Sequence, residues 1–346
     1  MDFNSELIQW YYTHKRALPW RETKDPYSIW LSEIILQQTQ IKQGLPYYLK
    51  FITNYPTVFD LAEASEDQVL KDWQGLGYYS RARNLHKTAK YVAKELKGVF
   101  PKTYEELLTL KGIGDYTASA IASICYEESV AVVDGNVYRV LSRCFGVDTP
   151  INSTEGVKQF KRLATLLLPK NNIGDYNQAL MEFGAKQCKP KSPDCSNCPL
   201  DSKCAALATA SVNKLPVKLK KTKIRKRYLN FLVQLTEDHK TVLEKRTEKG
   251  IWQHLYQFPM LESDTSISKK ELLANSGFKK IHALKLKSVE LYNSKEILHK
   301  LTHQDLHVKF WIIQIKDNIN NGISWAEAQS HAVPVVIAQF IKTFNP

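Results

Sequence analysis

The stretch LKGIGDYTASAIASICYE, residues 110–127, decides the fold of the first part of the chain. Gly112 and Gly114 enclose a single isoleucine, and after them small and apolar residues recur at helical spacing. The missing side chains let backbone N–H groups approach an anion, and the next helix directs its N-terminus at the same anion. The pattern therefore predicts a phosphate-binding turn between two helices, although an ordinary turn gives the same two glycines.

The size and charge of the chain narrow the choice of partner. With 346 residues it is long enough for two domains, and its formal net charge of +13 favours a polyanion, with nucleic acid ahead of an acidic membrane surface. The N-terminus lacks the features of a signal peptide, and no run has the roughly 20 apolar residues that span a bilayer. We therefore expect a soluble, intracellular protein without a membrane partner.

The spacing of apolar residues changes along the chain. It is helical up to about residue 210, so the first two-thirds is expected to be mostly α. Residues 214–227, KLPVKLKKTKIRKR, contain no acidic residue and indicate a linker that could lie along phosphates. Beyond it, 228–235 and 307–315 alternate as strands do, the turn TEDHK predicts a hairpin, and 333–344 suits a closing helix. The last third is therefore expected to be a separate α+β domain.

Four of the six cysteines lie within residues 188–204, CKPKSPDCSNCPLDSKC. Thiols inside a cell stay reduced, so this density predicts a metal site rather than disulfides. Cys188, Cys195, Cys198 and Cys204 are separated by six, two and five residues, with one CxxC pair where zinc ribbons usually have two. Four thiolates can bind either zinc or a 4Fe-4S cluster, and the spacing favours the cluster.

This cysteine spacing resembles the iron-sulfur loop of the endonuclease III and MutY branch of helix-hairpin-helix DNA glycosylases. The turn at 110–114 resembles the L-P-G-V-G hairpin of that family, with Lys111 in place of proline. The resemblance implies a 4Fe-4S cluster on the four cysteines and phosphate binding by Gly112 and Gly114. The departure from the family at Lys111 adds a cation that could bind the same phosphate. Lysines at 186, 189, 191 and 203 could present cations to DNA. The remaining Cys125 and Cys144 are expected to be buried, inert thiols.

Asp134, in VVDGNVYRVLSR, precedes a Gly-Asn turn into a helix. A carboxylate at this place can simply cap the helix. In the resembling family the matching Asp is the catalytic carboxylate, which stabilises or captures the oxocarbenium ion that forms when a glycosidic bond breaks. We further expect Asn136 to orient Asp134, and Arg139 and Arg143 to lie on the DNA side of the helix.

Tyr116 distinguishes between the branches of that family. Members with lyase activity carry a lysine two residues after the last glycine of the hairpin, where an amine attacks the sugar. This chain has Tyr116 there, so the resemblance places Tyr116 among the catalytic residues of a monofunctional enzyme that uses water.

Residues 17–43, ALPWRETKDPYSIWLSEIILQQTQIKQ, resemble the N-terminal signature of MutY adenine DNA glycosylases. By that match Glu33 is the general acid that protonates the adenine leaving group at N7. Without the match, SEIILQQTQ would be an amphipathic helix whose N-terminus Ser32 or Glu33 satisfies. With it, Glu33 and Asp134 form the pair of carboxyl groups of a glycosidase, at a separation that spacing does not give.

The same resemblance assigns residues that contact the DNA. Gln38 and Tyr78, the latter in GLGYYSRARNL, match residues that enter the gap left in the duplex. Core packing is the alternative for Tyr78 and its neighbour Tyr79. The pocket for the extruded adenine is assigned to Arg16, Trp20, Arg21, Gln178 and Glu182.

Residues 244–262, EKRTEKGIWQHLYQFPMLE, resemble the start of the MutT-like domain with which MutY proteins inspect 8-oxoguanine opposite adenine. No sequence after residue 226 has the Nudix hydrolase pattern, so we expect binding without nucleotide hydrolysis. The family's Phe-Ser-His recognition loop is represented by Leu301, Thr302 and His303, which keep a hydroxyl group and lose aromatic stacking.

Together these resemblances imply a mostly α helix-hairpin-helix glycosylase domain over 1–213 with an iron-sulfur loop at 188–204. A basic linker at 214–226 and a MutT-like, Nudix-fold α+β domain at 227–346 follow. The expected activity is hydrolytic excision of adenine opposite 8-oxoguanine, and also opposite guanine, from double-stranded DNA in base excision repair. The expected protein is a cytoplasmic monomer of bacterial type that is associated with the nucleoid. An endonuclease III-like lyase and a catalytically idle iron-sulfur protein on DNA are the alternatives. Tyr116 and the extra domain disfavour the first, and the retained carboxyl pair disfavours the second.

Overall fold

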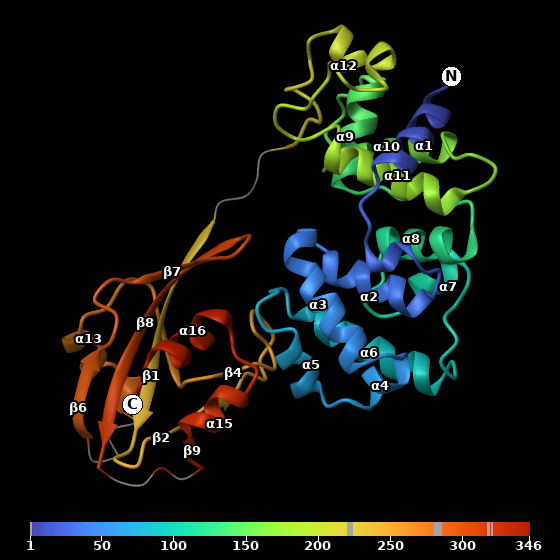
Figure 1. Cartoon of the computed structure of the whole chain (residues 1–346). Coiled ribbons are helices and arrows are strands. Elements are labelled where there is room, and N and C mark those ends of the chain that lie inside the picture. The colour runs from blue at the N-terminus through green and yellow to red at the C-terminus, as the bar shows by residue number, and fades with distance from the viewer. Residues whose placement is uncertain (1, 220–223, 280–285, 317–318, 320) are drawn as a thin grey trace. The chain divides into compact units, whose positions relative to one another are not determined.

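The computed structural model describes residues 2–219, 224–279, 286–316, 319 and 321–346 (Figure 1). The chain divides into two compact units. The helical unit comprises Met1–Glu63 and Asn84–Lys220, and the mixed unit comprises Ala64–Arg83 and Lys221–Pro346. Among the described residues, no helix is long and apolar enough to cross a membrane.

The helical unit consists of helices joined by short turns, as the spacing of apolar residues predicts. Its helix α6 begins in the mixed unit and continues into this one. The elements are α1 (Phe3–His14), η1 (Pro19–Arg21), α2 (Pro26–Leu36), α3 (Ile41–Asn54), α4 (Val58–Glu63), α6 (Ser80–Lys94), α7 (Tyr104–Leu108), α8 (Asp115–Tyr126), α9 (Gly135–Phe145), α10 (Thr154–Leu166), α11 (Ile173–Lys186), η2 (Asp201–Lys203) and α12 (Ala205–Ala208).

Helix α11 lies at the centre of one core of the helical unit, because it packs against α1, α8 and α9. Trp10 of α1 meets the ring of Phe183 edge-on, with the ring centroids 4.9 Å apart. Phe160 of α10 is also fully buried in this core. Burial of each such ring contributes about 1.5–3 kcal/mol. The packing fixes one face of α11 toward η1 and the start of α9, where the candidate site lies.

The turn between α7 and α8 has the predicted helix-hairpin-helix form. Gly112 has a φ of +84°, which glycine adopts without strain, and a Cβ there would lie 2.7 Å from Cβ of Asn84 on α6. Gly114 is the N-cap residue of α8, and a Cβ built on it would meet no atom within 4 Å. The two glycines therefore serve different purposes: one permits the turn, and the other leaves its outside open.

The mixed unit is built on a five-stranded sheet with the strand order β5-β1-β8-β6, in which β7 also pairs with β8. The central strands β1 and β8 are parallel, and the other pairs are antiparallel. Its strands are β1 (Arg225–Leu235), β2 (Lys240–Thr241), β3 (Glu244–Lys245), β4 (Tyr256–Gln257), β5 (Met260–Ser263), β6 (Leu286–Leu291), β7 (Ile297–Lys300), β8 (Gln304–Ile315) and β9 (Ile323–Ser324). Its helices are α5 (Glu66–Asp72), α13 (Lys269–Ala274), α14 (Ser276–Lys279), α15 (Trp325–Ser330) and α16 (Val335–Thr343).

Helices cover both faces of this sheet. Trp311 of β8 packs with Leu272 of α13 and Phe278 of α14. The preceding residue, Phe310, faces the other way and stacks on Phe340 of α16 with centroids 4.1 Å apart. This alternation is what a central strand buried on both faces requires. The predicted strands at 228–235 and 307–315 and the closing helix are confirmed.

Two local expectations are corrected. The turn at 236–240 forms, but the strand after it, β2, pairs with β9 and not with β1, so the predicted hairpin is wrong. The expected linker is tied down at its start, because Val217 accepts a backbone hydrogen bond from Ile151 at 3.0 Å and Leu219 contacts the Asn152 side chain. Residues 220–223 of that linker lie outside the described residues. The boundaries at 213 and 226 remain predictions.

Candidate functional site

Glu33 is a buried carboxyl group near the end of α2. The residue is 7% exposed, and burial raises the pKa of Glu33 to about 7. A hydrogen bond with Tyr116 and the charge of Arg21 oppose this rise, whereas the charge of Asp134 adds to it. At neutral pH the group is therefore divided between its acid and carboxylate forms, which suits a general acid.

Tyr116 in the first turn of α8 supplies the phenol that contacts Glu33. Its hydroxyl group also donates toward Sδ of Met181 on α11, at 3.5 Å. Burial, with the nearby charges of Glu33 and Asp134, raises the pKa of Tyr116 well above its usual value. The position that carries an amine in lyases of the resembling family thus carries a neutral phenol.

Asp134 caps α9 and is held by three donors. Its Oδ1 accepts from the backbone N–H groups of Asn136 and Val137, and its Oδ2 accepts from Nδ2 of Asn136, all at 2.8 Å. Burial raises the pKa of Asp134, and these hydrogen bonds oppose the rise. The capping and functional interpretations are compatible, because a carboxylate offers about four lone-pair directions, of which the cap uses two and the Asn136 side chain one.

Asn136 links Asp134 to a buried arginine. Arg139 Nη2 donates to Oδ1 of Asn136 at 2.8 Å and to the carbonyl of Gly184 at 2.6 Å, and its Nε donates to the carbonyl of Cys188 at 2.7 Å. Asn136 therefore has the contacts expected of a residue that orients Asp134. The same network reaches the first cysteine of the 188–204 loop.

The expectation that Arg139 and Arg143 lie on a DNA-facing side of α9 is wrong. Arg139 is 8% exposed and Arg143 is 2% exposed. Arg143 donates to the carbonyls of Leu215 at 3.1 Å and Lys189 at 2.7 Å, so its donors are committed to irregular backbone. A guanidinium group suits this role because its five N–H groups can satisfy several carbonyls at once.

Glu182 on α11 is an anion held between two arginines. Arg16 contacts it through Nε at 2.7 Å and through Nη2 at 2.5 Å, and Nη2 of Arg21 contacts it at 2.8 Å. Burial alone would raise the pKa of Glu182, but hydrogen bonds from both arginines outweigh burial and lower it to about 2. The structure thus brings together three of the residues assigned to the adenine pocket.

The other assigned residues of the helical unit occupy different settings. Trp20 is buried, and its ring meets Tyr48 edge-on at 4.9 Å. Gln178 is partly buried on α11, one turn before Glu182. Gln38 is exposed after α2 with a φ of +53°, an uncommon conformation for a residue with a side chain. Lys111 is exposed beside the open face of the hairpin, and its carbonyl accepts from Thr88 at 2.7 Å.

The four cysteines of the 188–204 loop line one small cavity, together with Arg143 and Cys144. All described cysteines are free thiols, and Nη1 of Arg143 donates to Sγ of Cys188 at 3.3 Å. Within the described residues, no three His, Cys, Asp or Glu side chains converge into a site for a metal ion.

A fit can nevertheless be judged from the donor chemistry of this loop. A zinc ion would need its four sulfur ligands on a single atom, whereas a 4Fe-4S cluster takes one thiolate on each of four irons. Four thiols around a shared cavity, next to a buried guanidinium group, fit the cluster better. Cys144 is buried as expected but contacts Cys204 at the edge of this cavity.

The lysines of this loop differ in how available they are. Lys186 donates to the carbonyl of His14 at 2.5 Å, and Lys203 pairs with Glu6 at 2.6 Å. Lys189 and Lys191 are exposed. Lys189 and Lys191 are therefore the two lysines of this loop that are best placed for the predicted contact with a phosphate.

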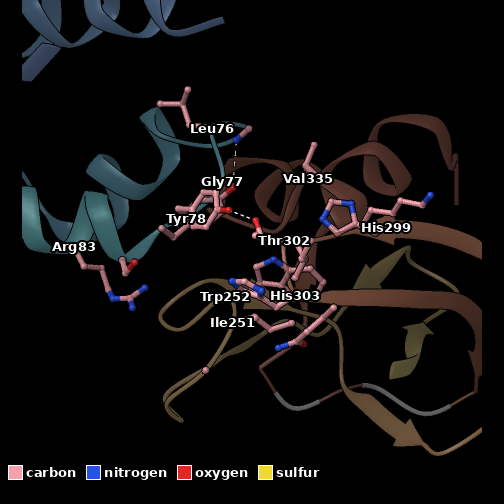
Figure 2. Close-up of a pocket in the computed structure, with 17 residues that line it drawn as sticks. Leu76, Gly77, Tyr78, Arg83, Ile251, Trp252, His299, Thr302, His303 and Val335 are labelled. Carbon is pink, nitrogen blue, oxygen red and sulfur yellow. Dashed lines mark hydrogen bonds between the residues drawn. The ribbon is translucent and has the colours of Figure 1, made fainter. Parts of the chain in front are cut away.

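The mixed unit contains a pocket of about 470 Å³ in which two separately predicted features meet. Figure 2 shows Tyr78 reaching from the turn before α6 toward the β7–β8 turn, where its hydroxyl group contacts Oγ1 of Thr302. Tyr78 is 45% exposed and Tyr79 is buried, so core packing applies only to Tyr79. Leu301 and His303 also line this pocket.

Sequence reasoning missed several residues of the same pocket. Arg83, Trp252 and His299 line it beside the residues named above (Figure 2). In the sequence, only Gly250 indicates an unusual backbone near Trp252. No local spacing connects Arg83 with the loop that contains Trp252, about 170 positions later. Met181 was missed for the same reason.

Comparison with known protein families identifies both parts of the chain. Residues 31–165 match the family described as HhH-GPD superfamily base excision DNA repair protein. Residues 230–343 match the NUDIX domain family. The solved structure of a thermostable thymine-DNA glycosylase superimposes with a TM-score of 0.56 at 31% identity, covering 60% of this chain and 95% of that one.

Curated relatives extend the similarity beyond one domain. An adenine DNA glycosylase of Buchnera aphidicola subsp. Baizongia pistaciae is 35% identical over 354 residues, covering 99% of this chain and 97% of its own. An adenine DNA glycosylase of Homo sapiens is 44% identical over 213 residues, covering 59% of this chain and 39% of its own. Because the similarity to the first spans both units, the chain belongs to the adenine DNA glycosylases, which are DNA N-glycosylases of base excision repair.

Proposed function

We propose that this enzyme hydrolyses the N-glycosidic bond of adenine opposite 8-oxoguanine, and opposite guanine, in double-stranded DNA. It acts as a monofunctional glycosylase. The observation that carries the proposal is the pair of buried carboxyl groups, Glu33 with a pKa of about 7 and Asp134 held by three donors. One can deliver a proton, and the other is held in place by donors that favour its carboxylate form.

The proposed reaction begins at the leaving group. Adenine leaves poorly as an anion, so Glu33 protonates its N7 as the bond to the sugar breaks. The resulting positive charge on the sugar is stabilised, or captured transiently, by Asp134. Water then attacks C1′ of the sugar and passes a proton to the Glu33 carboxylate left by the first step. Where Asp134 has bonded to C1′, that bond breaks in the same step and the carboxylate is restored. Tyr116 keeps Glu33 in place through their hydrogen bond and offers no amine for a Schiff base.

Arg16, Trp20, Arg21, Gln178 and Glu182 form the proposed pocket for the extruded adenine. The Glu182 carboxylate is already neutralised by its two arginines, so it can accept from an exocyclic amine without leaving a lone buried charge. Arg21 also acts on the charge of Glu33, which couples occupancy of the pocket to the acid.

The cofactor in this proposal is a 4Fe-4S cluster on Cys188, Cys195, Cys198 and Cys204. When bound, it would crosslink the loop that follows α11. The protein's own contribution is the bracing of that loop by Arg139 and Arg143 through carbonyls of residues 188–190. Absorbance near 400 nm in purified protein, at roughly the wavelength of iron-sulfur proteins, would distinguish the cluster from zinc.

The remaining elements are assigned to DNA recognition. Lys111, Gly112 and Gly114 bind a backbone phosphate at the hairpin. Gln38 and Tyr78 enter the gap left by the extruded base, and Leu301, Thr302 and His303 contact the base opposite it. The glycosylase domain comprises 1–213 and the recognition domain 227–346, and the partner is nucleoid DNA that contains these mispairs.

One experiment tests the proposal directly. The protein is incubated with duplexes that hold A opposite 8-oxoguanine, A opposite G, or thymine glycol, and strand breaks are compared with and without alkali. We expect breaks at A only after alkali, and little covalent complex after borohydride. Breaks without alkali or efficient trapping would show lyase chemistry, and cleavage at thymine glycol would overturn the substrate assignment.

A further inference from the structure

Arg83, in the first turn of α6, connects the segment that carries Tyr78 to a loop of the C-terminal strands. Its Nη1 donates to the carbonyl of Gln253 at 2.7 Å, and its Nη2 donates to Oε1 of the same residue at 3.2 Å. Gln253 is itself fixed by a hydrogen bond from Nε2 to the carbonyl of Thr247 at 3.2 Å. One guanidinium group thus holds both acceptors of one glutamine.

The loop on the other side of this contact has an unusual backbone. Trp252 and His254, the two neighbours of Gln253, have φ values of +60° and +68°. Residues with bulky side chains adopt such values rarely, and they persist only where the surroundings impose them. Here His254 is held by Glu66 at 2.6 Å, and the buried Trp252 ring lies 6.0 Å from that of His299.

The segment before Arg83 is shaped by a second set of contacts. Tyr78 has a φ of +46°, and Gly77, beside it, accepts at its carbonyl from Nε1 of Trp73 at 3.0 Å and Nη2 of Arg81 at 3.3 Å. The exposed Tyr78 ring then meets Thr302 across the pocket (Figure 2). Two turns with uncommon backbone conformations, which Arg83 connects, therefore line the same pocket.

We propose that Arg83 is a positioning residue for inspection of the base opposite adenine, and that it holds Tyr78 and the 250–254 loop at a fixed separation across the pocket. The inference rests on the proposed function of that pocket. In the variant without this contact, Tyr78 and Thr302 no longer share one defined geometry, so 8-oxoguanine and guanine are told apart less well. The adenine chemistry at Glu33 does not involve Arg83.

The test compares Arg83→Met with Lys87→Met, which removes an exposed positive charge one turn later on α6. Single-turnover excision rates are measured on duplexes with A opposite 8-oxoguanine and A opposite G, at saturating full-length protein. We expect Arg83→Met to lower the ratio of the two rates about tenfold or more, since charge-assisted hydrogen bonds of this kind are lost. Lys87→Met should keep the wild-type ratio.

Further variants separate positioning from stability. Arg83→Lys can reach one acceptor at a time and should restore part of the ratio. Gln253→Leu removes the side-chain acceptor alone, so it should lower the ratio less than Arg83→Met does. In the double variant, the ratio should be close to that of Arg83→Met alone. Because Gln253→Leu leaves the backbone contact in place, it tests the inference even where Arg83→Met fails to fold.

Each outcome has a definite meaning. Equal loss on both duplexes, or an unchanged ratio in Arg83→Met and Gln253→Leu, would overturn the inference while leaving the proposed function intact. A wild-type protein that excises adenine from neither duplex would overturn the proposed function and, with it, this inference. That second failure is visible in the wild type alone, so the two are distinguishable.

Discussion

Two buried glutamates of the helical unit, Glu33 and Glu182, ionise at opposite ends of the range for a carboxyl group. They are 7% and 1% exposed, yet the pKa is about 7 for Glu33 and about 2 for Glu182. Burial raises the pKa in both cases, so burial alone does not explain why the pKa of Glu182 ends below the usual value. The donors do: Glu182 is held by two arginines, whereas Glu33 has one phenol and a carboxylate nearby.

Asp134 is a third buried carboxyl group, and it has a different set of donors. Three N–H donors hold it, but none of the three carries a full positive charge, and its pKa stays above the usual value. The site thus contains a proton donor, a pinned carboxylate and a neutralised anion, made from the same functional group. The number and charge of the donors decide which role each carboxyl group can perform.

The largest expected effect comes from removing the acid. Glu33→Gln keeps the shape of the side chain and loses the proton that the leaving adenine needs, so excision opposite 8-oxoguanine should fall by about 10²–10⁴. Single-turnover assays measure the rate, and gel-shift titration should show duplex binding close to that of the wild type. Substantial remaining excision would show that Glu33 is not the general acid. The difference in pKa between Glu33 and Glu182 would then have no role in the reaction.

The pH dependence of the wild-type rate tests the same group without a mutation. Only protonated Glu33 can donate, so the rate should decline as pH rises through about 7. Single-turnover rates between pH 5.5 and pH 9, roughly two pH units either side of that pKa, would show it. The decline should be absent from the residual activity of Glu33→Gln.

The next effect concerns stability at Glu182. Glu182→Gln leaves two arginines without their anion and should cost about 3 kcal/mol of unfolding free energy at neutral pH. Because the pKa of Glu182 is lower in the folded protein, this difference is present above the unfolded value of about 4.5 and shrinks as pH falls toward 2. Denaturant unfolding at pH 7 measures it. Glu155→Gln, at an exposed position of α10, is the control and should cost little.

Glu33→Gln should stabilise the protein in the same unfolding assay, whereas Glu182→Gln destabilises it. The folded pKa of Glu33 is raised, so the wild type loses stability as pH rises from about 4.5 to about 7, and the variant does not. The free energy of unfolding of the variant, relative to that of the wild type, should therefore rise by roughly 2 kcal/mol between pH 5 and pH 8. A loss of stability at pH 8 would mean that the Glu33 carboxylate is better solvated than its burial indicates.

The smallest expected effect is at Asn136. Asn136→Ala removes the side-chain donor to Oδ2 of Asp134 but leaves both backbone donors to Oδ1, so the carboxylate stays near its place with more freedom. Excision should fall about tenfold, the loss typical of one hydrogen bond to a charged group. An unchanged rate in a single-turnover assay would show that the backbone cap alone positions Asp134.

Much of the fold followed from short-range pattern. The hairpin at 110–114, the helices before it, and the strands at 228–235 and 307–315 depend on turn residues and on periods of 3.6 and 2, which sequence contains directly. The pairing of β2 with β9 did not follow, because nothing in the turn at 236–240 says which strand lies beside it. Spacing predicts elements better than it predicts their partners.

The site shows the same limit. Glu33, Asp134 and Tyr116 were predicted together, through a resemblance that covers their motifs. The expected exposure of Arg139 is wrong because a charged residue on a helix usually faces solvent. Only the fold shows that the carbonyls of Gly184 and Cys188, together with the amide oxygen of Asn136, surround it. The contact of Tyr78 with Thr302 joins positions more than 200 residues apart, and no local pattern could predict it.

The two glycines of the hairpin would behave differently in a saturation library. At Gly112 any other residue would have to adopt a left-handed backbone conformation and would clash with the Asn84 side chain. Substitutions there should therefore prevent folding. At Gly114 the same substitutions have room and should survive a screen for folding. Folded Gly114 variants are then introduced into a cell that lacks its own enzyme. If they do not lower its mutation rate, Gly114 is required for DNA binding and not for folding. Comparing the two screens would map the edge of the phosphate contact genetically.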